Sequence, residues 1–126
     1  IGYKTSELPA FYSTKSGFNV DYRIDAAIEI AGILKTKWDL SIDGGVLVTN
    51  PIPVAFELES SDMNEAINLA IIEADNEGIT GKKITPYLLS KVNEITKGKS
   101  LDANIKLIKN NADLAAKISV HYANSL

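Results

Sequence analysis

The chain has 126 residues, of which 45% are hydrophobic and 23% are charged, the usual balance of one globular domain rather than of a disordered chain. A net charge of −3, without any block of like charges, disfavours a nucleic-acid-binding face. The absence of cysteine excludes disulfides and thiolate sites, and no apolar run is long enough to span a membrane. We therefore expect a soluble protein of the cytoplasm, with an intracellular organelle as the alternative.

The first half of the chain predicts short strands and one helix. Alternating apolar residues over 18–24 indicate a half-buried strand, and the spacing over 25–40 predicts a helix with Asp25 as its N-cap. The run Val46–Thr49, between the glycine turn at 43–45 and the segment 50–53, is typical of a strand buried on both faces. Ile1-Gly2-Tyr3 resembles the tail of a strand whose beginning is missing.

The second half predicts three helices. They begin near Asp62, Thr85 and Ser100, each a residue that caps helices well, and the last runs nearly to the C-terminus. Helical spacing in the last one predicts an inward stripe made of Leu101, Ile105, Ile108, Ala112, Ala115 and Ile118.

Two or three short strands and about four helices predict an α/β protein, but a buried parallel strand needs neighbours on both sides. We therefore expect that residues 1–126 form the C-terminal part of a larger α/β/α sandwich whose upstream half is absent. The alternative is a small, self-sufficient helical domain.

Two asparagines are the candidate binding residues. Asn50 follows the predicted strand 46–49, and ligands of parallel sheets gather at such strand ends; the alternative is that Asn50 only favours a turn before Pro51. Asn104 shares one side of the last helix with Ile108 and Asn111, where a buried amide requires partners that a bound heterocycle or sugar could provide. Alternatively, Asn104 caps a neighbouring loop and Asn111 bonds to the backbone.

The other polar residues suggest no chemistry. His121 lies near the chain end without a second metal ligand, and the lysines at 82–83, 97 and 99 are typical of a solvated surface. Phosphate-loop, metalloprotease and serine-hydrolase motifs are absent from the sequence.

Three phrases in a fixed order carry a family resemblance. They are GGVLVTNPIP at 44–53, TPYLL at 85–89 and SLDANIKLIKNNA at 100–112, preceded by GYKTSELPAFY at 2–12. Together they resemble the pseudouridine-5'-phosphate glycosidase family, also called the indigoidine synthase A-like family, over essentially the whole chain.

The resemblance implies an enzyme that reversibly cleaves pseudouridine 5'-phosphate to uracil and ribose 5-phosphate, with Mn²⁺ as cofactor and a homotrimeric assembly. It further implies that the ribose opens and is held on a lysine as a Schiff base. The family's catalytic lysine, acidic proton donor, phosphate-side lysine and metal ligands all match positions upstream of Ile1, so neither catalytic nor metal-binding residues are expected in this chain.

Within the chain, the resemblance implies that Asn104 contacts the pseudouridine. Asn50 and Thr85 are expected as pocket neighbours, from their positions at a strand exit and a helix entry. The chain by itself is expected to be inactive. Two alternatives remain: a non-catalytic interaction module derived from the family, and a small helical binding domain whose resemblance is accidental.

Overall fold

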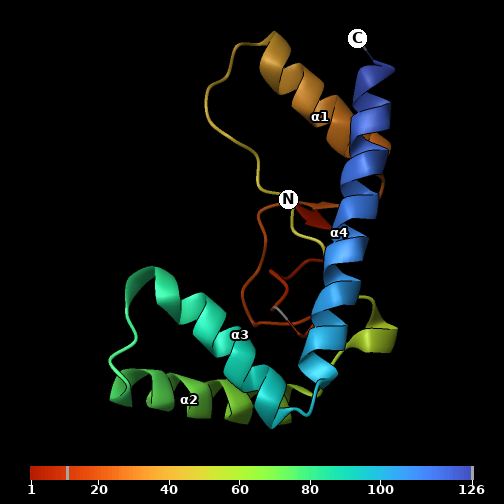
Figure 1. Cartoon of the computed structure of the whole chain (residues 1–126). Coiled ribbons are helices and arrows are strands. Elements are labelled where there is room, and N and C mark those ends of the chain that lie inside the picture. The colour runs from red at the N-terminus through yellow and green to blue at the C-terminus, as the bar shows by residue number, and fades with distance from the viewer. Residues whose placement is uncertain (11, 126) are drawn as a thin grey trace.

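A small parallel sheet lies near the middle of the protein, whose computed structural model describes residues 1–10 and 12–125 (Figure 1). Strand β1 (Gly2–Tyr3) pairs in parallel with β2 (Arg23–Ile24). On the other side of β1, residues 47–49 also run parallel, since the Tyr3 N–H donates to the Thr49 carbonyl at 2.8 Å. The spatial order is therefore β2, β1, then 47–49. Phe11, which belongs to the GYKTSELPAFY phrase, lies outside the described residues.

Both predicted strands are shorter and more exposed than the sequence indicated. Only Arg23 and Ile24 of the segment 18–24 join the sheet, and Phe18 and Tyr22 expose 69% and 71% of their surface. The segment 46–49 was predicted to be buried on both faces, yet it forms an edge and Leu47 is 73% exposed. The physical reason is that β1 is the only strand beside it within the described residues.

The four α-helices of the described residues follow the predicted order, although each begins at a different residue from the predicted cap. They are α1 (Ala27–Asp39), α2 (Ser60–Asn76), α3 (Ile84–Ile95) and α4 (Lys99–Ala123), with short 3₁₀ turns η1 (Val54–Phe56) and η2 (Gly81–Lys83). The capping predictions for Asp25, Asp62, Thr85 and Ser100 are wrong, because the cap positions are Ala26, Glu59, Lys83 and Gly98. Asp25, for example, pairs instead with the Arg23 guanidinium at 2.8 Å.

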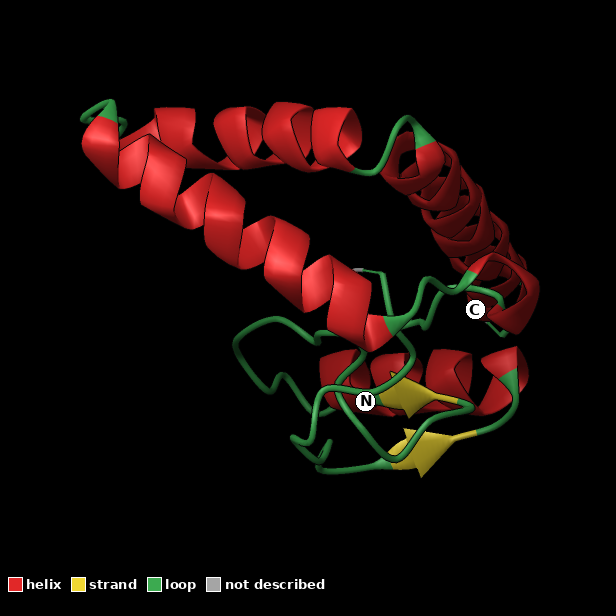
Figure 2. Cartoon of the chain, turned by 90° about the horizontal axis from the view of Figure 1, so that it is seen from below, coloured by secondary structure: helices red, strands yellow, loops and turns green. Residues whose placement is uncertain are grey.

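Helix α4 connects two parts of the structure. Its C-terminal half packs against α1, near the strands, while α2 and α3 form a hairpin that projects from its N-terminal end (Figures 1 and 2). The predicted α/β class is confirmed. No helix in the described part of the chain combines the length and apolar character required to cross a bilayer.

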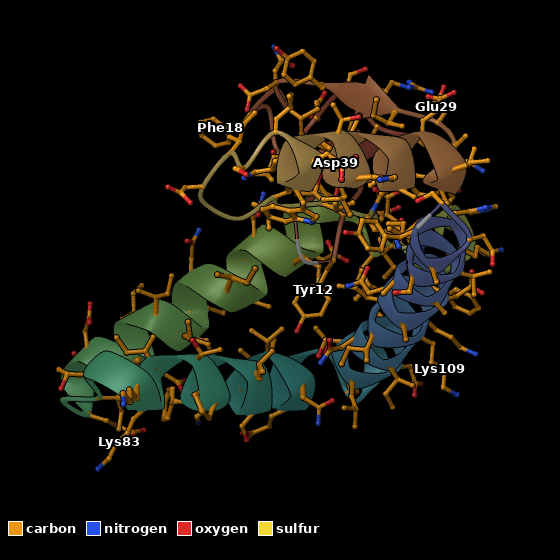
Figure 3. The ribbon with its side chains drawn as sticks, turned by 90° about the horizontal axis from the view of Figure 1, so that it is seen from above. Tyr12, Phe18, Glu29, Asp39, Lys83 and Lys109 are labelled. Carbon is orange, nitrogen blue, oxygen red and sulfur yellow. The ribbon has the colours of Figure 1, made fainter. Side chains whose placement is uncertain are left out.

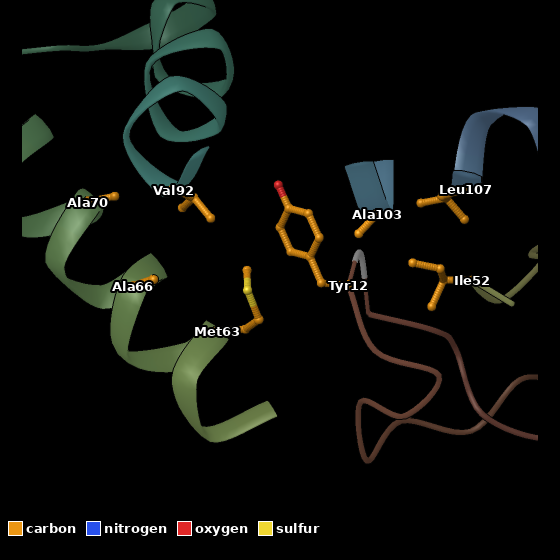
Figure 4. Close-up of a cluster of buried hydrophobic side chains, with 8 residues drawn as sticks. All are labelled: Tyr12, Ile52, Met63, Ala66, Ala70, Val92, Ala103 and Leu107. Atoms are coloured by element: carbon orange, nitrogen blue, oxygen red, sulfur yellow. The ribbon is translucent and has the colours of Figure 1, made fainter. Parts of the chain in front are cut away.

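A small core holds the hairpin to the rest of the chain. Tyr12 points into the space between α2, α3 and α4, and only 6% of its surface is exposed (Figures 3 and 4). Burial raises the pKa of its phenol, and the neighbouring Ser100 hydroxyl offsets part of that rise. Around it lie buried side chains from three helices and the segment after residue 50: Ile52, Met63, Ala66, Ala70, Val92, Ala103 and Leu107.

The predicted inward stripe of the last helix is wrong in this structure. The buried positions of α4 are Ser100, Ala103, Leu107 and Leu114, whereas Leu101, Ile105 and Ile108 expose 50%, 41% and 59% of their surfaces. Both stripes have helical spacing, so periodicity alone could not decide which of them faces the described core.

The accessible surface is large for the mass. At 8338 Å² it exceeds by roughly a quarter the value of about 6,600 Å² that scaling gives for a compact 13.6 kDa monomer. Exposed apolar side chains contribute to this surface on α1, α2 and α4 and on the segment 40–47. The arrangement is more open than that of a self-contained domain.

Candidate functional site

A cleft of about 620 Å³ opens where β1 and the neighbouring segment 47–49 end. This is the edge at which parallel sheets bind ligands, and the volume is in the range of small-molecule sites. Its walls come mainly from the segment after β1, the segment after residues 47–49, the loop at 14–15 and the middle of α4. The lining residues are Tyr3–Glu7, Thr14, Lys15, Arg23, Asn50–Val54, Asn110, Asp113, Leu114 and Lys117.

The turn after β1 depends on two unusual backbone positions. A Cβ on Gly2 would lie 2.4 Å from the Thr5 carbonyl oxygen, so only glycine allows this close approach. Lys4 has a φ of 57°, a strained value for a residue with a side chain. Strain of this kind often accompanies functional sites, and here it turns Thr5 and Ser6 into the wall of the cleft.

The predicted residue Asn50 lines the cleft, and α4 holds the segment around it. The Asn50 side-chain N–H donates to the Asn111 Oδ1 at 3.1 Å, and the Asn110 amide donates to the Pro51 carbonyl at 3.0 Å. Thus Asn111, for which a backbone bond was one hypothesis, bonds to a side chain, and its neighbour Asn110 makes the backbone bond. The NPIP and NNA phrases contact each other directly.

Positive charge predominates in the cleft. Its lining has four cationic and two anionic side chains, although the net charge of the chain is −3. Arg23 pairs with Asp25 and Lys117 pairs with Asp113. Lys4 and Lys15 form no ion pair within the described residues, so together with the Ser6 hydroxyl they are suited to an oxyanion or a polyhydroxyl ligand.

Two carboxylates brace the loop that carries Lys15. Glu57 Oε1 accepts hydrogen bonds from the Thr14 backbone N–H at 2.7 Å, the Thr14 hydroxyl at 2.8 Å and the Ser13 hydroxyl at 3.0 Å. The bond from the Thr14 N–H is the main cause that lowers the pKa of Glu57. Glu7 similarly accepts the N–H groups of Gly17 and Ser16, which lower its pKa. Both groups are therefore structural anions.

The other two predicted site residues lie apart from the cleft. Asn104 is half-buried on α4, and its side-chain amide has no hydrogen-bond partner within the described residues. Thr85 is exposed in the first turn of α3. Neither lines the cleft, so the structure brings only Asn50 into it, and contact of the other two with a ligand stays a prediction.

Sequence reasoning missed the cations of the cleft. Lys4 follows β1 just as Asn50 follows the segment 46–49, so the rule about strand ends indicates this lysine as well. Lys117 is seven residues after Asn110, two helical turns along the same side of α4. Only the tertiary structure could bring Lys15 there, because it comes from an irregular loop.

The described residues do not fit a metal centre. No group of three or more histidine, cysteine, aspartate or glutamate side chains within residues 1–10 and 12–125 is arranged to hold an ion. Of the acidic groups in the cleft, Asp113 is paired with Lys117 and Glu7 is occupied by backbone amides.

Comparison with known proteins settles the family. Residues 1–121 match the family described as indigoidine synthase A like protein. The chain belongs to this family. The chain is also similar to relatives named pseudouridine-5'-phosphate glycosidase, one from Caldanaerobacter subterraneus that is 52% identical over 95% of this chain and one from Geobacillus kaustophilus that is 55% identical over 94%.

Two solved structures share the fold. An indigoidine synthase A-like protein from Thermotoga maritima superimposes with a TM-score of 0.82 and 33% identity over 94% of this chain and 39% of its own. The prealnumycin C-glycosynthase AlnA, solved with ribulose 5-phosphate, has a TM-score of 0.77 and 27% identity over 98% of this chain and 42% of its own. This chain spans about 40% of the length of the curated relatives that it matches.

Proposed function

We propose that this chain is the C-terminal part of an enzyme that reversibly cleaves pseudouridine 5'-phosphate to uracil and ribose 5-phosphate. The observation that carries the proposal is the identity of 52% to 55%, over nearly the whole chain, to relatives named for this reaction. The AlnA structure supports chemistry at a C-glycosidic bond, because that neighbour is named a C-glycosynthase.

The reaction requires more than this chain offers. A carbon–carbon bond has no leaving oxygen for a carboxylic acid to protonate, so the paired-carboxylate mechanism of ordinary glycosidases does not apply. A lysine that forms a Schiff base with the opened ribose would supply the electron sink, and we expect that lysine in the upstream half. A manganese ion would likewise take its ligands from residues outside this chain.

The contribution of this chain is to position substrate. Lys4, Lys15 and the Ser6 hydroxyl bind oxygen-rich groups of the substrate, and the NPIP segment is held in place by Asn110 and Asn111. Asn104 presents an amide that is free to pair with the imide of uracil, which has one N–H donor between two carbonyl acceptors.

A graft tests the proposal. The matched 119 residues of the Geobacillus kaustophilus relative are replaced by this chain, and uracil release from pseudouridine 5'-phosphate is measured with manganese present. We expect the graft to turn over substrate and the 126-residue chain alone to be inactive. A graft that unfolds cooperatively on heating but releases no uracil would refute the assignment, and an active isolated chain would refute the upstream location of the chemistry.

The large exposed surface also favours a second function, that of a non-catalytic interaction module. Such a module would bind an intact enzyme of this family, which we expect to be a trimer, without turning over substrate. Light scattering of the chain mixed with an intact relative separates the two functions, because the fragment proposal predicts no stable complex with an enzyme that already contains this part.

A further inference from the structure

Helix α4 has apolar residues on two sides. The inner side, with Ala103, Leu107 and Leu114, packs in the core. The opposite side, here called the outer seam, consists of Leu101, Ile105, Ile108, Ala112 and Ala115, all of which are exposed. A helix that is apolar on more than one side is typical of a buried element, yet in this structure one side faces solvent.

The outer seam has the spacing of a helix-packing surface. Successive members are separated by four, three, four and three residues, which is the a/d pattern of helices that pack nearly parallel or antiparallel. Residues at such positions insert as knobs between the side chains of a facing helix. The partner indicated by this pattern is an α-helix.

Charged residues are confined to one flank of the seam. Lys109 projects away from the ribbon of α4 toward solvent (Figure 3), and Asp102 and Lys106 are also exposed. On the other flank lie Asn104 and Asn111, between the outer seam and the inner side. A facing helix would therefore meet an uncharged strip about four helical turns long.

The relatives provide a source for that helix. Each curated relative and each solved structure has about 60% of its length beyond the part that matches this chain. The chain exposes roughly 1,700 Å² more than a compact monomer of its mass, about twice what one partner buries in a standard protein interface. The outer seam is one part of this excess surface, which also includes apolar side chains on α1, α2 and the segment 40–47.

We propose that a helix from the part of the polypeptide that this chain lacks packs along the outer seam of α4. This inference rests on the proposed function, because it assumes that the chain is one part of a longer enzyme. The packing makes the outer seam interior and places the added helix beside Asn104.

Single cysteines test the packing directly, because the natural chain contains none. Ile108→Cys lies in the outer seam and Val120→Cys lies on the same helix outside it, and both native residues are 59% exposed. Maleimide labelling is followed by peptide mass spectrometry, in the isolated chain and in the Geobacillus kaustophilus graft. In the isolated chain both positions should react at similar rates.

In the graft, labelling at Ile108→Cys should slow by at least about tenfold while Val120→Cys changes by less than about twofold, because a buried thiol is inert. Equal reactivity of the two positions in the graft would overturn the proposal. If the graft lacks a cooperative thermal transition, the two cysteines are placed at the aligned positions of the intact relative, where the same difference is required.

Two further outcomes separate the helix packing from a dimer contact and from the proposed reaction. Concentration-dependent dimers of the isolated chain that Ile108→Asp abolishes and Val120→Asp retains would make a second copy the occupant and reject the proposal. If Ile108→Cys is protected in a graft that does not turn over substrate, the packing is upheld and the proposed reaction is rejected. If the graft turns over substrate while Ile108→Cys remains reactive, the proposed reaction is upheld and the packing is rejected.

Discussion

The side-chain amide of Asn50 donates to the Asn111 Oδ1 at 3.1 Å, joining the exit of the segment 47–49 to α4 across 61 residues of sequence. Together with the bond from Asn110 to the Pro51 carbonyl, it fixes one wall of the cleft. The two phrases that carry the family resemblance are therefore parts of one structural unit.

Removing either end of this bond should have a small and coupled effect. Asn50→Ala and Asn111→Ala should each lower the free energy of unfolding by about 0.5 kcal/mol, the low end of the net value of a hydrogen bond, because this bond is exposed to solvent. In a double-mutant cycle by urea denaturation, the double variant should lose less than the sum of the two single variants. Strict additivity would show that the bond does not contribute in solution.

Glu57→Gln should destabilise the loop that carries Lys15, in a manner that depends on pH. The variant should lose about 1 kcal/mol at neutral pH, because bonds to a charged acceptor exceed neutral ones and solvent screens part of the gain. The folded-state pKa of Glu57 is lowered, so its stabilisation is complete above the unfolded-state pKa of about 4.3 and is lost as the pH falls through the folded value.

Urea unfolding of the wild type and Glu57→Gln between pH 7 and 3 measures this effect. The difference between the two proteins should shrink below about pH 4.3. Glu65→Gln, at an exposed position of α2, is the matched control. The difference in unfolding free energy between Glu65→Gln and the wild type should not vary over this pH range. If the difference in unfolding free energy between the wild type and Glu57→Gln were the same at all pH values, the ionised carboxylate would not have the proposed role.

Gly2→Ala should disrupt the turn after β1. The added methyl group would lie 2.4 Å from the Thr5 carbonyl oxygen and 2.9 Å from a Val20 methyl, so the backbone must shift, at a cost of roughly 2 kcal/mol. Gly32→Ala is the control, because it lies in α1 with open space around it and should stabilise the chain by about 0.5–1 kcal/mol. Thermal unfolding should show a lower melting temperature for Gly2→Ala and a higher one for Gly32→Ala than for the wild type.

Met63→Ala should loosen the hairpin from the rest of the chain. Met63 is 4% exposed beside Tyr12, and truncation of such a side chain costs about 2–5 kcal/mol. Ile72→Ala, at a 57% exposed position of the same helix, should cost less than about 1 kcal/mol. Equal losses in chemical denaturation would mean that the core around Tyr12 does not hold α2 in solution.

Asn104→Ala should impair catalysis without unfolding the protein. In the active graft, kcat/KM should fall by about tenfold or more, the equivalent of one lost hydrogen bond to the substrate, while the melting temperature remains nearly unchanged. Lys109→Ala, exposed on the same helix, should leave both values unchanged. An unaltered rate would remove Asn104 from the substrate site.

The sequence by itself determined the class and order of the elements, because hydrophobic periodicity and turn residues act over short distances. It also indicated Asn50 from the rule about strand ends, and the family from three ordered phrases. Helix starts were predicted less well: Asp25 suits a cap, but its carboxylate is taken by the Arg23 guanidinium, a contact that capping rules do not consider.

Only the tertiary structure decided which apolar side of α4 faces the core and which residues form the cleft. Two stripes with the same period are equivalent until a neighbour covers one, and Ala103 and Leu107 join the cluster that contains Tyr12 only after the chain has folded back. The cations of the cleft converge from the turn after β1, a loop, β2 and α4 for the same reason. Hydrophobic periodicity shows that one side of a helix is apolar. Which element packs against that side depends on contacts between residues far apart in the chain.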